Sequence, residues 1–216
     1  MSGQFITIEG GEGVGKSTQA RLLAERLRAA GATVLELREP GGTPTGDRVR
    51  AIVLDHPGFT ISPRAELLLY EAARAELTAT VIVPALERGE VVVCDRFFDS
   101  STAYQGYGRG LGAEMVRTLN LAATGGMRPD LTVLLSLETG EALRRATTGG
   151  ADRIEAESLE FHRAVIAGFA DIAAAEPERV VAVDASGTVD AVAERVWAAV
   201  SAHPAGVRAT VRRMQS

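Results

Sequence analysis

The feature that most constrains this chain is an eight-residue segment matching the pattern G-x-x-x-x-G-K-[ST], namely Gly10-Gly11-Glu12-Gly13-Val14-Gly15-Lys16-Ser17. An apolar stretch suited to a strand precedes it, and an amphipathic stretch suited to a helix follows it. Glycines let successive backbone N–H groups turn inward, and the helix N-terminus adds partial positive charge, so the arrangement favours phosphate oxygens. We therefore predict a phosphate-binding loop; a glycine-rich turn that binds nothing is the alternative.

Two side chains at the end of this loop carry its expected chemistry. Lys16 is predicted to reach the β and γ phosphates of a nucleoside triphosphate, and the Ser17 hydroxyl is predicted to bind Mg²⁺. The predicted nucleotide-binding residues of the loop are Gly10, Gly11, Glu12, Gly13, Val14, Gly15, Lys16, Ser17 and Thr18.

Short β-rich runs alternate with longer helical patterns along the whole chain. Strands are predicted at residues 5–9, 34–38, 91–95, 131–137 and 180–184, and helices at 16–30, 48–54, 63–88, 114–124, 157–175 and 189–202. The strands are mostly continuous apolar runs, which is typical of strands covered on both faces. The alternation predicts one α/β domain over residues 1–216 with a parallel, doubly wound sheet, a bend or break at Pro84, and a frayed tail at 204–216.

Composition and charge narrow the classes of partner. The 216 residues are 46% hydrophobic, enough to bury one sizeable core, and the net charge of -5 offers no electrostatic footprint for a nucleic acid. No apolar run is long enough to span a membrane, and no basic segment precedes one at the N-terminus, so a cytoplasmic protein is expected. The single cysteine, Cys94, lies in an apolar run and is predicted to be a core thiol.

Charged residues in and near the loop suggest a second ligand beside the nucleotide. A carboxylate within a polyanion-binding loop is unfavourable unless it faces another group, so Glu12 is predicted to face a second ligand, with a solvent-facing side chain as the alternative. Asp95-Arg96 ends an apolar strand at the sheet edge where such folds bind ligands. Asp95 could support Mg²⁺ and Arg96 could grip an acceptor phosphate; a structural ion pair between the two remains equally open.

Two further segments follow predicted strands. Residues 38–43 form a Pro- and Gly-containing loop at the same sheet edge, which taken alone would favour an ordinary strand-ending turn over a ligand contact. Residues 100–110 bring hydroxyls, phenols and an amide together, which suits a neutral ring with a hydrogen-bonding edge.

These residues together resemble the bacterial thymidylate kinase family. The resemblance runs in order from about residue 3 to about residue 195 and rests on the phosphate loop with its internal glutamate, Arg38-Glu39-Pro40-Gly41-Gly42, Tyr70 and Arg74, Asp95-Arg96-Phe97, Ser100-Ser101, Ala103-Tyr104-Gln105-Gly106, Pro129-Asp130-Leu131 and Asp152-Arg153-Ile154-Glu155. It implies a five-stranded parallel sheet, ATP and Mg²⁺ at the phosphate loop, a dTMP pocket, a lid and a homodimer.

The resemblance also implies roles for residues around the base and sugar. Tyr70 would stack on thymine, Arg74 would donate to a base carbonyl, and Gln105 would pair with the thymine edge. Tyr104 would crowd the position of a ribose 2′-hydroxyl, which selects deoxyribose. Ser100 and Ser101 would line the base pocket.

The acceptor phosphate would be held by three arginines, Arg38, Arg50 and Arg96, because bidentate guanidinium contacts suit a phosphate. Glu12 and Glu39 would lie near the sugar or its metal-bound surroundings. Ser17 and Asp95 are the predicted metal ligands, and Lys16, Arg96, Arg153 and Glu12 are the predicted catalytic residues.

The chain departs from the family pattern in the loop and the lid. Gly13 and Val14 stand where some members carry an arginine, so the lid at 144–155 would have to supply positive charge. Arg153 is the predicted source of that charge, and Arg144 is predicted to contact the nucleotide. Alternatively, Arg153 only pairs with Asp152 or Glu155.

Two other functions fit parts of the sequence. A kinase for another nucleoside monophosphate would share the phosphate loop but not the base-reading residues. A switch or assembly protein that binds ATP without transferring phosphate would need neither Glu12 nor a second pocket.

Overall fold

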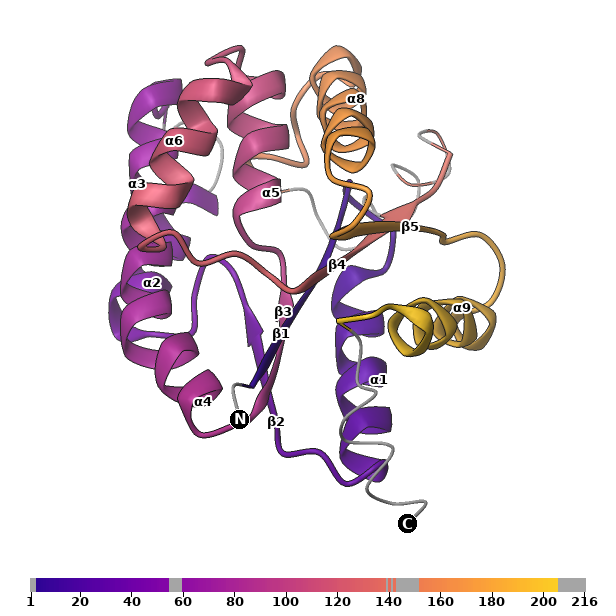
Figure 1. The fold of residues 1–216 in the computed structure, drawn as a ribbon. Coiled ribbons are helices and arrows are strands. Elements are labelled where there is room, and N and C mark those ends of the chain that lie inside the picture. Colours follow the sequence, from indigo (N-terminus) through magenta and orange to yellow (C-terminus); the bar gives the residue numbers. More distant parts are fainter. Residues whose placement is uncertain (1–2, 55–59, 139, 141, 143–151, 206–216) are drawn as a thin grey trace.

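The computed structural model describes residues 3–54, 60–138, 140, 142 and 152–205, which contain one five-stranded parallel sheet (Figure 1). The strand order is β2-β3-β1-β4-β5. The strands are β1 (Gln4–Gly10), β2 (Val34–Arg38), β3 (Val91–Asp95), β4 (Leu131–Ser136) and β5 (Val180–Asp184). All five predicted strands and the predicted α/β fold are confirmed.

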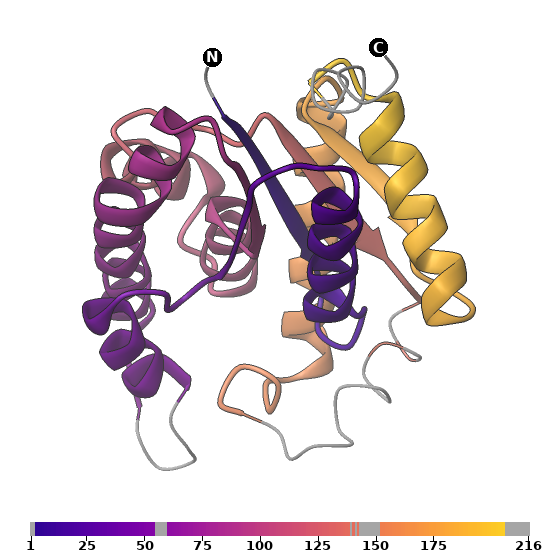
Figure 2. The same cartoon turned by 90° about the horizontal axis from the view of Figure 1, so that it is seen from below.

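Helices cover both faces of this sheet. Figures 1 and 2 show α1 (Lys16–Ala29) and α9 (Val189–Ala202) side by side on one face. The opposite face carries the other described helices: α2 (Pro44–Leu54), α3 (Pro63–Leu77), α4 (Val83–Glu87), α5 (Phe98–Ser101), α6 (Ala113–Ala123), α8 (Leu159–Ala175) and two π-helical segments, η1 (Thr78–Ile82) and η2 (Thr102–Gly108). None of the described helices is both long and apolar enough to cross a membrane.

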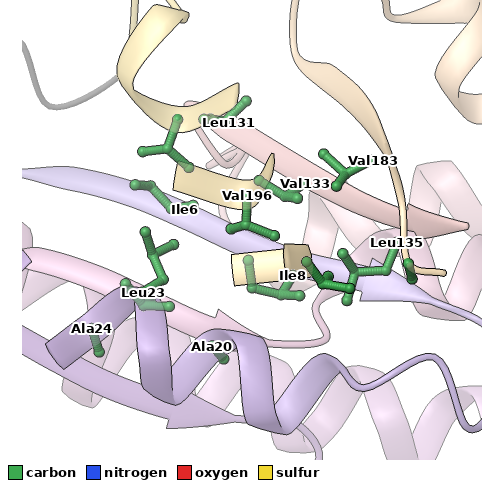
Figure 3. Packing of buried hydrophobic residues seen from close by; sticks show 14 of the residues in the cluster. Ile6, Ile8, Ala20, Leu23, Ala24, Leu131, Val133, Leu135, Val183 and Val196 are labelled. Atoms are coloured by element: carbon green, nitrogen blue, oxygen red, sulfur yellow. The ribbon is translucent and has the colours of Figure 1, made fainter. Parts of the chain in front are cut away.

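The two-sided covering explains the continuous apolar strand sequences. Ile6 and Ile8 of β1 pack with Leu23 and Val196 in the core between the sheet and helices α1 and α9, as Figure 3 shows. Phe5, which directly precedes Ile6 in β1, faces the opposite core, where it packs with residues of α3 and α4. Because successive side chains alternate between two buried faces, both sets must be apolar. The two edge strands, β2 and β5, are the exceptions, since each is only partly buried.

Several predicted boundaries shift for local reasons. The predicted helix 63–88 is divided into α3, η1 and α4, with Pro84 in the first turn of α4, which confirms the predicted interruption. Because Pro84 has no N–H to bond a carbonyl of the preceding turn, the regular α-helical pattern is interrupted there. The π-helical segment η1 lies directly before α4. Helix α8 begins later than predicted because Ser158 accepts a bond from the Phe161 N–H and caps it. Helix α2 begins earlier, at Pro44.

No element was predicted for residues 98–108, which form α5 and η2. Thr102, Ala103, Tyr104, Gln105 and Gly106 are all buried in η2. The polar side chains obscure the helical pattern because they face a pocket rather than solvent. Of the predicted lid and tail, only residues 152–155 and 204–205 lie within the described part of the chain.

Leu23 provides a test of the packing between α1 and the sheet. Its side chain is 3% exposed, so Leu23→Ala should leave a cavity and lower the free energy of unfolding by about 2–5 kcal/mol. Leu159→Ala is the matched control, because Leu159 is 46% exposed and its truncation should cost less than about 1 kcal/mol. Denaturant unfolding of both variants measures the difference; equal losses would contradict the assigned packing.

Candidate active site

The phosphate loop connects β1 to α1 and needs glycine at two positions. Gly10 has φ +141°, and a Cβ there would lie 2.5 Å from the carbonyl oxygen of Leu135. Gly15 is left-handed, with φ +92°, and directly precedes α1. A side chain would strain either position, so the tight curl that exposes the loop N–H groups depends on these glycines. The open N-terminus of α1 then faces the ligand side.

Lys16 is buried at the start of α1. Its Nζ donates to the Gly11 carbonyl at 2.5 Å and lies 4.0 Å from Glu12 Oε2. Burial lowers the pKa of Lys16 to about 8; Arg96 also lowers it, whereas Glu12 and Asp95 oppose the shift. The ammonium group is therefore held within the loop, where phosphate oxygens could replace its carbonyl partner.

Ser17 and Asp95 meet at the end of β3. Ser17 Oγ donates to Asp95 Oδ2 at 2.5 Å, and the buried Asp95 Oδ1 has no hydrogen-bond partner among the described residues. One hydroxyl and one carboxylate beside a phosphate loop suit Mg²⁺, which takes few protein ligands and completes its shell with phosphates and water. The described residues contain no cluster of three or more acidic, histidine or cysteine side chains that could hold a metal ion.

Arg96 joins the phosphate loop to the neighbouring pocket. Its backbone is left-handed, with φ +69°, and its Nη2 donates to Glu12 Oε1 at 2.6 Å. Nη1 donates to the Gly10 carbonyl and to Ser100 Oγ, both at 3.2 Å. The proposed Asp95–Arg96 ion pair is therefore not formed: Arg96 pairs with Glu12, and Asp95 pairs with Ser17.

Glu12 is an internal anion rather than a solvent-facing side chain, since it is only 13% exposed. Tyr104 donates its hydroxyl to Glu12 Oε1 at 2.7 Å, and the Arg96 guanidinium lies 5.1 Å from the Tyr104 ring centroid. Burial alone would raise the pKa of Glu12, but Arg96, Lys16 and the Tyr104 hydrogen bond lower it to about 2. The carboxylate thus remains charged and orients both neighbours.

Glu9, which was not predicted from the sequence as a site residue, binds two residues that follow Arg96. Glu9 Oε1 accepts the Phe97 N–H at 2.7 Å, and Oε2 accepts the Ser100 hydroxyl at 2.6 Å. Burial raises the pKa of Glu9 to about 7, with Asp99 adding to the shift. A carboxylate at the end of an otherwise buried strand was the available signal, because such a group needs donors close by.

A cavity of about 330 Å³ opens beside the phosphate loop. This size suits a small-molecule ligand. Among its lining residues are 17 that the sequence predicted for the site: Glu12, Gly13, Gly15, Lys16, Ser17, Thr18, Arg38, Glu39, Arg50, Tyr70, Arg74, Asp95, Arg96, Ser100, Ser101, Tyr104 and Gln105. Gly10, Gly11 and Val14 instead line a second cavity behind the loop, and Arg144 lies outside the described residues.

Two arginines of this cavity have no ion-pair partner among the described residues. Arg38 is exposed at the end of β2, and Arg50 Nη1 donates to the Pro40 carbonyl at 3.1 Å. Burial lowers the pKa of Arg50, and the nearby charge of Arg38 lowers it further. Uncompensated positive charge of this kind favours an anion such as a phosphate.

Arg74, by contrast, is already fully engaged. It is 1% exposed, and its five N–H donors reach Glu39, Glu71, Asn120, the Phe97 carbonyl and Ser101 at 2.7–3.3 Å. Burial raises the pKa of Glu39 to about 7 even though Arg74 opposes the shift. Donation from Arg74 to a base would require one of these bonds to be given up, and the longest is the 3.3 Å bond to Phe97.

Arg153 takes neither of the partners weighed from the sequence. Its Nη2 donates to Glu66 Oε2 at 2.5 Å, and its Nε donates to the Val53 carbonyl at 2.9 Å. Asp152, Ile154 and Glu155 line the cavity, whereas Arg153 is not among its lining residues. A role for Arg153 at the transferring phosphoryl group therefore stays a prediction and would require its release from Glu66.

The strand order, the phosphate loop and the adjoining cavity define a P-loop nucleotide-binding protein with room for a second ligand. The sequence profile of the thymidylate kinase family matches residues 8–196. Thymidylate kinases from Synechococcus sp. (strain JA-3-3Ab) and Deinococcus radiodurans are each 54% identical, over 91% and 92% of this chain and 94% and 97% of theirs. The crystal structure of thymidylate kinase from Ehrlichia chaffeensis, 32% identical, superposes with a TM-score of 0.76 over 93% of this chain and 99% of that one. The chain belongs to the thymidylate kinase family.

Glu9 gives a pH-dependent test of the site's electrostatics. Its pKa is about 7 in the folded protein against 4.5 in an unperturbed glutamate, so its contribution to stability is complete below pH 4.5 and is lost as pH rises through 7. Glu9→Gln removes this titration. Between pH 5 and pH 8, the free energy of unfolding should therefore fall more in the wild type than in Glu9→Gln, by about 1–3 kcal/mol.

Denaturant unfolding at a series of pH values measures this difference. Glu25→Gln is the control, because Glu25 is exposed and its variant should follow the wild-type pH dependence. A Glu9→Gln profile parallel to that of the wild type would show that the buried carboxyl does not titrate in this range.

Proposed function

We propose that this protein transfers the γ-phosphoryl group of ATP to dTMP, producing ADP and dTDP with Mg²⁺ as cofactor. The observation that carries the proposal is the Arg96–Glu12–Tyr104 cluster, which joins the phosphate loop to the adjoining cavity. A donor nucleotide at the phosphate loop and an acceptor in the cavity could thus bind on opposite sides of this charged cluster. Family membership supports the same reaction.

On the donor side, the loop N–H groups and Lys16 would bind the ATP phosphates. Ser17 and Asp95 would hold Mg²⁺ together with phosphate oxygens. The metal, when bound, would neutralise phosphate charge and fix the orientation of the polyphosphate. Burial and the nearby charge of Arg96 lower the pKa of Lys16 to about 8, so a bound polyphosphate would favour its charged form.

On the acceptor side, we assign the dTMP phosphate to Arg38, Arg50 and Arg96. The first two have no competing ion pair among the described residues, so they can bind a phosphate without first releasing a carboxylate. Tyr70 would stack on thymine, with Gln105, Ser100, Ser101 and Arg74 around the base. Tyr104 would lie against the sugar and disfavour a 2′-hydroxyl, and Glu39 would lie nearby.

The chemical step then needs orientation and charge neutralisation rather than a protein base. An oxygen of the dTMP phosphate forms a bond to the γ-phosphorus as the bond from that phosphorus to the bridging oxygen breaks, and ADP leaves. The acceptor oxygen is already anionic, so no proton must be removed from it. Arg96, fixed by Glu9 and Glu12, would stabilise the charge between the two substrates.

We assign the remaining positive charge to the lid, through Arg153 and Arg144. Arg153 lies at the lid's base, where its bonds to Glu66 and the Val53 carbonyl hold it in the described conformation. A movement of this segment onto bound ATP would exchange those partners for phosphate oxygens. An arginine in such a role is worth roughly 10³–10⁵ in rate in related reactions.

An enzyme of this description would release ADP in a manner that depends on the acceptor. With ATP and Mg²⁺, turnover should be greatest with dTMP and weak with UMP, AMP, GMP and CMP, with dUMP between, as measured by coupled ADP release. Preference for another monophosphate would keep the phosphate loop but overturn the base assignment. ADP release independent of any acceptor, or none at all, would favour a protein that binds ATP without transferring phosphate.

Lys16→Ala is the control for contaminating activity in this assay. The substitution removes the ammonium group that lies beside the Gly11 carbonyl and Glu12 and that would bind the ATP phosphates. Turnover with dTMP should fall at least about a hundredfold while the fold is retained.

We further propose a homodimer that acts in the cytoplasm. Leu68 of α3 is 51% exposed and Ile52 of α2 is 41% exposed, on two helices that pack against each other, and a second copy would cover them. Light scattering coupled to size exclusion should give twice the chain mass at micromolar concentration, and Leu68→Glu should shift it toward the monomer. A monomeric wild type under these conditions would contradict the proposal.

A further inference from the structure

Glu66 of α3 is a fully buried carboxylate that joins three separate parts of the acceptor side. Its Oε1 accepts bonds from Gln105 Nε2 at 2.8 Å and from Arg109 Nε at 3.2 Å. Its Oε2 accepts bonds from Arg109 Nη2 at 3.1 Å and from Arg153 Nη2 at 2.5 Å. Each oxygen therefore has two donors, which fills the acceptor capacity of the carboxylate.

These bonds fix which way round the Gln105 amide lies. A carboxylate paired with two guanidinium groups can only accept hydrogen bonds, so it must face the NH₂ end of the amide. The carbonyl oxygen Oε1 is left on the other side. Because Gln105 is 2% exposed and lines the acceptor cavity, that carbonyl is the group the amide can offer to a ligand as an acceptor.

The carboxylate itself has little freedom to turn. Arg109 is also bound to Glu157 at 2.5 Å and lies 4.7 Å from the Phe161 ring centroid, which ties it to the start of α8. Arg153 is bound to the Val53 carbonyl at the end of α2. The orientation of Gln105 is therefore set before any ligand binds, which avoids the cost of ordering it on binding.

We propose that Glu66 is a specificity-determining positioning residue, which makes Gln105 present a hydrogen-bond acceptor to the base. Thymine and uracil carry an N3–H donor on their pairing edge, whereas N3 of cytosine is an acceptor. A carbonyl held toward that edge binds the first two and repels the third, because two acceptors would then meet without a proton. This inference rests on the proposed function and adds a cause for its base preference.

The test compares three acceptors in one variant. Glu66→Gln keeps the shape of the side chain but can donate as well as accept, so the Gln105 amide becomes free to turn over. The ratio of kcat/KM for dTMP to that for dCMP should fall at least about tenfold. The ratio of kcat/KM for dTMP to that for dUMP should stay within about threefold of its wild-type value, since both bases present the same N3–H.

The ratios separate this role from a general structural one. A loss of stability, or an altered position of Arg153, would lower turnover with all three acceptors alike and leave both ratios unchanged. Glu157→Gln is the matched control, because it removes the other carboxylate bound to Arg109 without touching Gln105, and it should keep the wild-type ratios. An unchanged dTMP to dCMP ratio in folded Glu66→Gln would overturn the inference.

A double variant covers the case in which Glu66→Gln does not fold. Arg109→Gln combined with Glu66→Gln removes one of the two guanidinium groups that lose Glu66 as a partner, and it is compared with Arg109→Gln alone. The same fall in the dTMP to dCMP ratio is expected, and equal ratios would again overturn the inference. A wild-type enzyme that does not phosphorylate dTMP would instead contradict the proposed function, so the two failures are distinct.

Discussion

The ion pair between Arg96 and Glu12 is the interaction on which the rest of the site depends. It links the loop after β1 to the segment after β3, two adjacent strands whose carboxyl ends meet at one edge of the sheet. Arg96 occupies a left-handed backbone conformation that is unfavourable for a non-glycine residue. Glu9 offsets this cost by binding the following N–H and the Ser100 hydroxyl, so the guanidinium is aimed before a substrate arrives.

Carboxylates set the positions of most of the buried arginines on the acceptor side. Glu39 and Glu71 hold Arg74, and Glu66 holds Arg109 and Arg153. Removing one partner from such a pair would leave an unpaired buried charge, which is strongly destabilising. Arg38 and Arg50 differ because the described residues supply no ion pair for either. This contrast separates the arginines that build the cavity from those that remain available to a phosphate.

The engaged arginines also limit what each can do in the described conformation. Arg74 has no spare donor, and its bonds fix the positions of Glu39 and Ser101 in the cavity wall. Arg153 is held between the end of α2 and the start of α3 by the Val53 carbonyl and Glu66. One carboxylate, Glu66, therefore connects the Gln105 amide to the Arg153 guanidinium.

The sequence by itself determined the five parallel strands, the phosphate loop and the family, because these depend on contiguous motifs and on local periodicity. It also placed most of the site residues on one sheet edge, since residues that directly follow parallel strands must gather there. The tertiary structure alone decided the partners of Arg74 and Arg153, the support from Glu9 and Glu66, and the helical form of residues 98–108. Most of those contacts join residues far apart in the chain, for example 35 positions for Arg74 and Glu39 and 88 positions for Phe97 and Glu9, so only the packed fold brings the donors within reach of the buried charges.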